Sequence, residues 1–177
     1  MKYILVILTG YLLGCSSMAW YLAKLYKADL RGSGTGNLGA SNTVVLLGWK
    51  AGVLTALHDI LKAFLAVLIA GWLFPDLEHG RAAAGVACVL GHIFPFYLTF
   101  KGGKGFASFF GMTLALNWRL ALVIAVKELL RAPLDTLFAG HMAARAVRYF
   151  LIVITAGIIW PMTFGWFSRL GRKVKIK

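Results

Sequence analysis

The chain has 177 residues, of which 60% are apolar, and its formal net charge is +13. Water-soluble domains are only about half apolar, so the composition excludes an ordinary soluble domain and indicates a polytopic membrane protein. The length fits one membrane domain, residues 1–177, without a soluble appendage. The basic residues lie in short loops between apolar runs, which favours cytoplasmic loops beside anionic lipid over a nucleic-acid partner.

The first apolar run, from Tyr3 to about Leu25, is long enough to cross a bilayer. Gly10 and Gly14 stand at the GxxxG spacing that allows close helix packing. The stretch LLGCSS around Cys15 resembles a lipoprotein cleavage site, but the apolar character continues beyond it, which favours a retained span. Because basic residues follow the run, we expect the N-terminus outside and the next loop in the cytoplasm.

The next loop, ADLRGSGTGNLGASN at residues 28–42, contains a literal GxGxxG. A dinucleotide-binding fingerprint requires a preceding strand within a βαβ unit, and here a membrane span precedes the loop, so that interpretation is rejected. The hydroxyl and amide side chains of the loop can still hydrogen-bond a polar ligand without adding charge. The alternative is a flexible interfacial loop.

A second span is expected from Ala51 to Phe74, with His58, Asp59 and Lys62 near its cytoplasmic end. Ionisable groups at membrane depth are costly and therefore pair or line a wet site. Asp59 and Lys62 are three residues apart, so an ion pair within the helix is one explanation, and a role in shaping a site is the other.

A third span, from 82 to 100, returns the chain to the cytoplasm in the stretch GHIFPFYLTFKGGKGFASFFG, residues 91–111. Its central loop sets Lys101 and Lys104 among glycines just before a second apolar segment. Glycines let backbone amides converge, and lysines and a helix start add positive potential, which favours a site for phosphate or another small anion. The alternative is an interfacial turn whose lysines extend to water. Charge counting places this loop and loop 28–42 on one membrane face, which favours a shared site.

The segment from Phe106 to Leu116 is too short to cross a bilayer unaided, and residues 120–130 then run back. Short helices of this kind indicate a compact all-α bundle with short or half-membrane elements. Residues 150–167 form a clear apolar span, whereas residues 133–148 are only moderately apolar. Two crossings here would return the basic tail to the cytoplasm, so we expect seven helices in preference to six.

Several chemistries have no signature in this sequence. Cys15 and Cys88 lack metal-ligand spacing, and the histidines include no HExxH pair, so no metal site and no cofactor is predicted. No serine lies in a GxSxG elbow, and no histidine is followed five residues later by aspartate. If the protein is an enzyme, positioning and hydrogen-bond donors aimed at anionic oxygens must supply most of its catalysis.

Three stretches, DLRGSGTGNLGASN, HDILKAFLAV and GHIFPFYLTFKGGKGFASFFG, together resemble the bacterial acyl-phosphate:glycerol-3-phosphate acyltransferases, the PlsY family. The resemblance covers residues 22–116, and its central motif is highly specific. It implies a seven-helix fold in the bacterial plasma membrane with active-site loops facing the cytoplasm. It also implies acyl phosphate and glycerol 3-phosphate as substrates, and transfer of a fatty acyl group to the sn-1 hydroxyl to give lysophosphatidic acid.

The resemblance also assigns site residues. The residues expected in the catalytic group are Thr35, Asn37, His92 and Lys104. The residues expected to bind substrate phosphate are Gly36, Gly39, Asn42, Lys101, Gly102, Gly103, Gly105 and Ser108.

Two departures from the family pattern bear on activity. Val45 stands where the family has an arginine three residues after the first motif, and Lys50 is the nearest basic residue. The third family motif is not recognisable in the C-terminal SRLGRKVKIK. A buried anion that loses one charged partner loses roughly 10²-fold in binding or rate. The first alternative function is therefore a catalytically impaired relative that binds or senses phospholipid precursors. A second, from another functional class, is a small anion transporter that uses the same loops.

Overall fold

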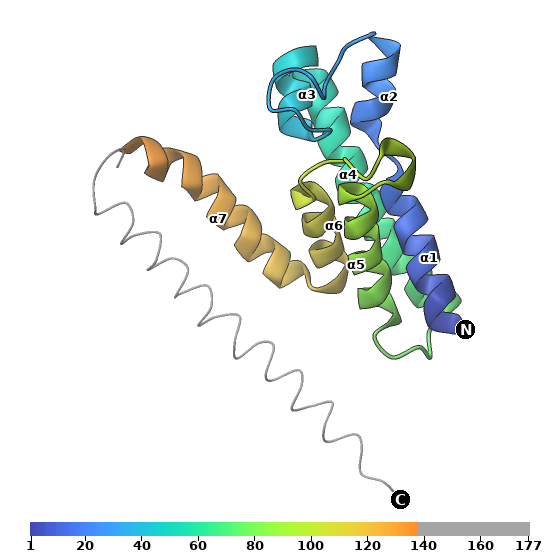
Figure 1. The fold of residues 1–177 in the computed structure, drawn as a ribbon. Coiled ribbons are helices and arrows are strands. Elements are labelled where there is room, and N and C mark those ends of the chain that lie inside the picture. The colour runs from blue at the N-terminus through green and yellow to red at the C-terminus, as the bar shows by residue number, and fades with distance from the viewer. Residues whose placement is uncertain (138–177) are drawn as a thin grey trace, which may run out of the picture. The chain divides into compact units, whose positions relative to one another are not determined.

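The computed structural model describes residues 1–137, and every regular element in that range is helical (Figure 1). The elements are α1 (Lys2–Cys15), α2 (Met18–Leu25), α3 (Ala40–Leu47), α4 (Trp49–Leu73), α5 (Gly80–Ile93), the 3₁₀ helix η1 (Phe96–Leu98), α6 (Phe106–Leu116) and α7 (Trp118–Leu137). The predicted all-α class is thereby confirmed for this range. The expected spans at 51–74 and 82–100 correspond to α4 and to α5 with η1, and α6 has the predicted bounds.

The chain divides into two compact units, residues 1–118 and residues 119–177. The first unit holds α1 to α6 and both glycine-rich loops, and the second holds nearly all of α7. The predictions of six or seven helices, of a span at 150–167 and of a basic tail fall on residues 138–177, which lie outside the described residues. The unrecognised third motif lies there as well.

Small residues allow the helices of the first unit to pack closely. A Cβ atom added to Gly10 or Gly14 of α1 would lie 2.4 or 2.0 Å from the carbonyl oxygens of Ala84 and Cys88 of α5. The GxxxG prediction is therefore confirmed as a tight contact between α1 and α5. Gly111 plays the same part in α6, where an added Cβ would lie 2.1 Å from the Ile60 carbonyl oxygen of α4.

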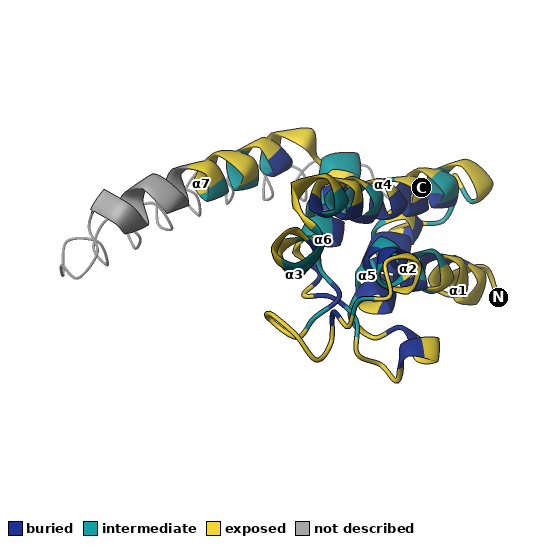
Figure 2. Ribbon diagram, turned by 90° about the horizontal axis from the view of Figure 1, so that it is seen from above, coloured by how far each residue is buried: buried dark blue, intermediate teal, exposed yellow. Residues whose placement is uncertain are grey.

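The outward faces of these helices are apolar, as a lipid-facing surface requires. Three stretches, Lys2–Leu25, Trp49–Leu73 and Gly80–Leu98, are long and apolar enough to cross a membrane. Figure 2 shows the exposed residues on the outer faces of the helices and the buried ones between them. Large aliphatic and aromatic side chains such as Leu57, Leu61 and Trp72 are more than half exposed. Facing outward, they would contact lipid rather than water.

The first span is broken, which the sequence did not predict. We expected one continuous helix from Tyr3 to about Leu25, but α1 ends at Cys15 and α2 begins at Met18. The Ser17 hydroxyl caps α2 by accepting a hydrogen bond from the Trp20 amide at 3.4 Å. The stretch Lys2–Leu25 remains a candidate span with a break inside it.

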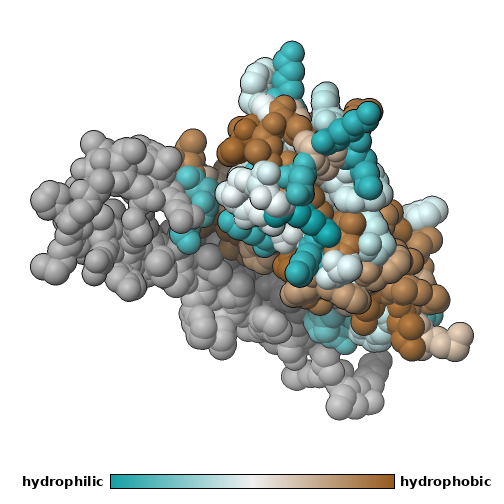
Figure 3. Space-filling model, turned by 45° about the horizontal axis from the view of Figure 1, so that its top comes forward, coloured by the Kyte–Doolittle hydropathy of each residue, from teal (hydrophilic) through white to brown (hydrophobic). Residues whose placement is uncertain are grey.

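The two glycine-rich loops lie at the same end of the first unit, opposite the α4–α5 turn at residues 74–79 (Figure 1). One loop connects α2 to α3, and the other connects η1 to α6. Figure 3 shows hydrophilic side chains gathered on the face that carries this end, with hydrophobic side chains along the flank. The bundle therefore brings the loops together as charge counting predicted.

Candidate functional site

Asn42 organises the first loop from its buried position in the first turn of α3. Its Oδ1 accepts the Thr35 amide hydrogen at 2.7 Å. Its Nδ2 donates to the carbonyl oxygens of Leu30 at 2.6 Å, Asn37 at 3.0 Å and Ser33 at 3.3 Å. A single buried side chain therefore fixes the backbone of residues 30–37.

The exposed surface of this loop carries the hydroxyl and amide that the sequence singled out. The Nδ2 of Asn37 donates to the Oγ1 of Thr35 at 2.8 Å. Thr35 is exposed and Asn37 is half-buried, so both face the solvent side of the loop. Gly36 adopts φ +69°, in the left-handed region where glycine is favoured. These residues form a polar rim that can hydrogen-bond a ligand.

The second loop is shaped by backbone contacts with the end of α5. The amide of Gly102 donates to the Ile93 carbonyl at 2.9 Å, and that of Gly103 donates to the His92 carbonyl at 3.2 Å. A Cβ on Gly103 would lie 2.3 Å from the His92 Nε2. The glycines are therefore required by close approach to α5. Because these two amides are already donated, the remaining donors of the loop lie after Gly103.

Those remaining donors are at the start of α6. Gly105 precedes the helix with φ +83°, and the first amides of any α-helix lack intrahelical acceptors. Ser108, in the first turn, is fully buried, and its Oγ has no hydrogen-bond partner among the described residues. Lys104 is exposed directly before this turn. A lysine, a helix start and an unpaired hydroxyl together favour an anion.

The two loops contact each other directly. The Leu38 amide donates to the Gly102 carbonyl at 3.4 Å, and a Cβ on Gly103 would lie 2.9 Å from the Leu38 carbonyl oxygen. The Nη2 of Arg31 also donates to the carbonyls of Leu98 at 2.7 Å and Lys101 at 2.8 Å. The two motifs, more than sixty residues apart in sequence, therefore lie together and form one candidate site.

The chain matches known proteins over most of its length. The glycerol-3-phosphate acyltransferase family matches residues 4–168. The glycerol-3-phosphate acyltransferase 1 of Oceanobacillus iheyensis is 37% identical over 81% of this chain and 73% of its own length. That of Pseudomonas putida is 47% identical over 67% of this chain and 63% of its own length.

This chain belongs to the glycerol-3-phosphate acyltransferase family. The crystal structure of the integral membrane enzyme PlsY (YgiH) in its glycerol 3-phosphate form is similar, with a TM-score of 0.66, 31% identity, and coverage of 97% of this chain and 93% of that chain. Its lysophosphatidic acid form gives a TM-score of 0.63. The resemblance noted from the loop motifs is therefore confirmed, as is a multi-pass membrane protein.

The family context makes Val45 informative. It lies on α3 with 68% of its surface exposed, so a neutral side chain occupies the position where the family pattern expects an arginine. The nearby Lys50 has its Nζ 5.9 Å from the centre of the Trp49 ring. Among the described residues, the cations nearest in sequence to the glycines of the two loops are Arg31, Lys101 and Lys104.

Beneath the second loop of this family member lies a buried ionic network. The Asp59 carboxylate contacts the Lys62 ammonium at 2.8 Å, and the Lys62 Nζ lies 2.9 Å from the His92 Nδ1. The predicted ion pair within the helix is confirmed. His92 also accepts the Gly103 amide through its backbone carbonyl, so the pair is connected to the second loop. A role in shaping a site stays a prediction.

Sequence reasoning missed the role of Arg31, which entered the orientation argument only as one of the basic residues (Lys24, Lys27 and Arg31) that follow the first apolar run. Its contacts are made to residues 67 and 70 positions away, and no local pattern announces them. An arginine inside a glycine-rich loop was the available signal, because its fork of donors suits bridging carbonyl groups.

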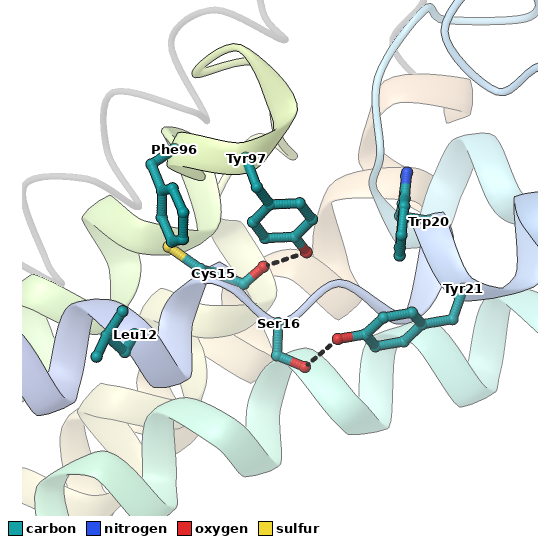
Figure 4. A pocket seen from close by; sticks show the side chains of 7 residues that line it. All are labelled: Leu12, Cys15, Ser16, Trp20, Tyr21, Phe96 and Tyr97. Carbon is teal, nitrogen blue, oxygen red and sulfur yellow. Dashed lines mark hydrogen bonds between the residues drawn. The ribbon is translucent and has the colours of Figure 1, made fainter.

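A pocket of about 300 Å³ lies at the break between α1 and α2 (Figure 4). It is lined mainly by aromatic and aliphatic side chains: Leu12, Cys15, Ser16, Trp20, Tyr21, Phe96 and Tyr97. The Tyr97 hydroxyl donates to the Cys15 carbonyl at 2.8 Å, so η1 closes one side of the pocket. This lining suits an apolar chain better than a sugar phosphate.

Proposed function

We propose that this protein transfers a fatty acyl group from acyl phosphate to the sn-1 hydroxyl of glycerol 3-phosphate, giving lysophosphatidic acid. The observation that carries the proposal is the direct contact of a hydroxyl- and amide-bearing loop with a lysine and glycine loop. Two phosphorylated substrates require two neighbouring sets of donors. Family membership and the glycerol 3-phosphate and lysophosphatidic acid forms of the similar PlsY structure support the same substrate and product.

The phosphate of glycerol 3-phosphate binds, in this proposal, at Lys104 and the first turn of α6. Lys104 supplies charge, and the Ser108 hydroxyl and the free amides of the turn supply donors. Gly102, Gly103 and Gly105 contribute by carrying no side chain, because each is pressed against α5. Lys101 adds a second exposed cation at the mouth of the loop.

The acyl phosphate binds at the rim of the first loop. Because the Thr35 hydroxyl accepts a hydrogen bond from Asn37, its own proton remains to be donated to a phosphate or carbonyl oxygen. Gly36 and Gly39 allow the ligand to approach the backbone. We propose that Asn42, whose amide is fully used within the loop, acts by holding Thr35 in place. The pocket at the α1–α2 break receives the apolar chain.

We propose that the protein promotes the reaction mainly by positioning the two substrates next to each other. The sn-1 oxygen attacks the acyl carbon, a new ester C–O bond forms, and the bond to the phosphate oxygen breaks with release of inorganic phosphate. The buried Asp59 carboxylate is paired with Lys62, so we propose that a substrate phosphate oxygen takes the hydroxyl proton. His92, predicted in the catalytic group, lies beneath the loop with its ring buried, and we propose that it shapes the loop.

The active-site end is proposed to face the cytoplasm. The residues around both loops include several cations, and basic residues collect on the cytoplasmic side of membrane proteins. Among the described residues in the loops and at the adjoining helix ends, these cations are Lys24, Lys27, Arg31, Lys50, Lys101 and Lys104.

Activity of the purified protein tests the proposal. We expect lysophosphatidic acid from glycerol 3-phosphate and palmitoyl phosphate, and none from palmitoyl-CoA assayed in parallel. Lys104→Ala should lower the rate by about 10²-fold, because a charge-assisted contact is lost. Lys2→Ala, which removes an exposed cation near the opposite end of α1, should leave it unchanged. Binding of glycerol 3-phosphate without turnover would instead support the impaired, precursor-binding relative.

A further inference from the structure

The ionic network under the second loop extends beyond a single ion pair. Asp59, Lys62 and His92 are 2%, 6% and 5% exposed, respectively. The Asp59 Oδ1 lies 2.8 Å from the Lys62 Nζ and 3.3 Å from the His92 Nδ1. If Asp59 and Lys62 formed only an ion pair within α4, no side chain from another helix would be part of the network. Here α4 supplies the pair and α5 supplies the imidazole that closes the triangle.

A buried network of charges adds little to the stability of the folded protein, because removing the charges from water costs free energy. Replacing a buried ion pair by apolar side chains of similar volume is often neutral or stabilising, so the charges fit a role in fixing one arrangement. In this molecule the arrangement they fix is next to the proposed phosphate site. The carbonyl of His92 accepts the amide of Gly103, and its Nε2 lies where a Gly103 side chain would be.

Lys62 and Asp59 together hold the ring of His92. The Lys62 Nζ lies 2.9 Å from the His92 Nδ1, and the Asp59 Oδ1 lies 3.3 Å from the same nitrogen. On the other side of the ring, the Nε2 faces Gly103. The network therefore sets the orientation of the ring on which the loop rests.

The same lysine holds the break in the first span. Its Nζ donates to the Ser16 carbonyl at 2.6 Å, an oxygen that has lost its helical partner where α1 ends. The Nε2 of His58 lies 3.1 Å from the Ser16 Oγ. One ammonium thus joins the α1–α2 break, which lines the apolar pocket, to the histidine that supports the phosphate loop.

We infer that Lys62 is a positioning residue for the reaction: it sets His92, and through His92 it sets the Gly102–Gly103 segment that faces the phosphate of glycerol 3-phosphate. Asp59 holds the lysine in place through their contact of 2.8 Å. This inference rests on the proposed function for its substrate, but the connection between the network and the loop stands on the contacts alone.

A charge-removal series tests the inference. Lys62→Met removes the ammonium and leaves Asp59 buried without its ion-pair partner. The double variant Asp59→Asn with Lys62→Met removes both charges and so restores electrical balance. Thr55→Val is the matched control, because Thr55 is fully buried on the same helix and, within residues 1–137, its hydroxyl bonds only to the Ala51 carbonyl. The measurements are the KM for glycerol 3-phosphate, kcat, the melting temperature, and hydrogen exchange of residues 99–105.

For Lys62→Met we expect a lower melting temperature and a KM for glycerol 3-phosphate raised by at least tenfold. In the double variant the melting temperature should recover, while the KM stays raised and residues 99–105 exchange faster than in wild type. Thr55→Val should keep the wild-type KM and exchange. Recovery of both the melting temperature and the KM in the double variant would overturn the inference, because the network would then only stabilise the fold.

Failure of the proposed function gives a different result. If the wild-type protein makes no lysophosphatidic acid, the function is wrong, and the exchange of residues 99–105 still decides the inference. Unchanged exchange in the double variant would then refute a link between Lys62 and the loop.

Discussion

The two glycine-rich loops reach a similar purpose by different means. The first is held by one side chain, Asn42, whose amide group bonds to the backbone at residues 30, 33, 35 and 37. The second is held by backbone amides donated to the end of α5 and by the absence of side chains at Gly102 and Gly103. We therefore expect the first loop to lose its conformation when the Asn42 side chain is removed. The second loop should lose its conformation when a side chain is added at Gly102 or Gly103.

Adding a methyl group to the second loop should produce the largest effect. In Gly103→Ala the new methyl meets the His92 Nε2 at 2.3 Å and the Leu38 carbonyl oxygen at 2.9 Å, and a backbone carbonyl cannot move without displacing the first loop. We expect kcat/KM for glycerol 3-phosphate to fall by at least about 10²-fold, the usual result of displacing reacting groups by about 1 Å.

The control for that variant is Gly48→Ala. Gly48 has φ +85°, but no described residue lies within 4 Å of an added Cβ, so alanine there strains the backbone without collision. It should lower the melting temperature and leave kcat/KM unchanged. Equal activity losses in the two variants would show that general destabilisation explains both.

Removing the side chain that holds the first loop should have the next largest effect. Asn42→Ala deletes four hydrogen bonds, and at about 1 kcal/mol net each the loss of stability is ~3 kcal/mol, allowing for relaxation. Chemical denaturation in detergent and acyl-transfer assays measure the two consequences. Ser41→Ala, an exposed neighbour, should change neither. A fully active, stable Asn42→Ala protein would refute the organising role.

Cutting the bridge between the loops should have a moderate effect. Arg31→Met keeps the aliphatic stem and removes the donor to Leu98 and Lys101. Because the guanidinium belongs to an exposed residue, we expect about a tenfold fall in kcat/KM, equivalent to ~1.4 kcal/mol. Lys27→Met removes the same formal charge without a contact to the second loop and should retain activity. Equal losses in both variants would point to charge alone.

The smallest expected effect is a loss of local stability in the first loop at acid pH. The Asp29 Oδ1 accepts the amides of Gly32 and Arg31, and these hydrogen bonds lower the pKa of the carboxyl group. A lowered folded-state pKa gives stability that is present above the unfolded-state pKa of about 3.9 and is lost as the pH falls through the folded value. Protection of residues 29–34 against hydrogen exchange, taken relative to the intrinsic rate at each pH, should therefore fall below about pH 4 in wild type. Asp29→Asn should lose that dependence, and an identical acid response in both proteins would contradict this cause.

The sequence predicted the parts of this molecule that depend on local pattern. The spacing of Gly10 and Gly14 indicated close packing, and the bounds Phe106–Leu116 followed from an apolar run between a glycine loop and Asn117. Charge counting placed both loops on one face. The motifs at residues 28–42 and 91–111 also indicated the family of the chain, and the family match confirms it.

The features that the sequence did not predict depend on distant partners. The break at Ser16 is invisible in an apolar run because Lys62 and Tyr97, from other helices, satisfy the carbonyl oxygens that it exposes. The bridging role of Arg31 depends on residues near position 100. The amides of Gly102 and Gly103 looked available to an anion until α5 was seen to accept them. Long-range contacts of this kind leave no periodic trace.

The most direct test of a single site built from both loops is a double-mutant cycle on kcat/KM for glycerol 3-phosphate acylation by palmitoyl phosphate. Asn37→Ala weakens the rim of the first loop, and Lys104→Ala removes the cation next to the first turn of α6 in the second loop. If both loops act on one transition state, the double variant should lose at least tenfold less activity than the product of the two single losses, a coupling of ~1.4 kcal/mol. Fully multiplicative losses would contradict the shared site.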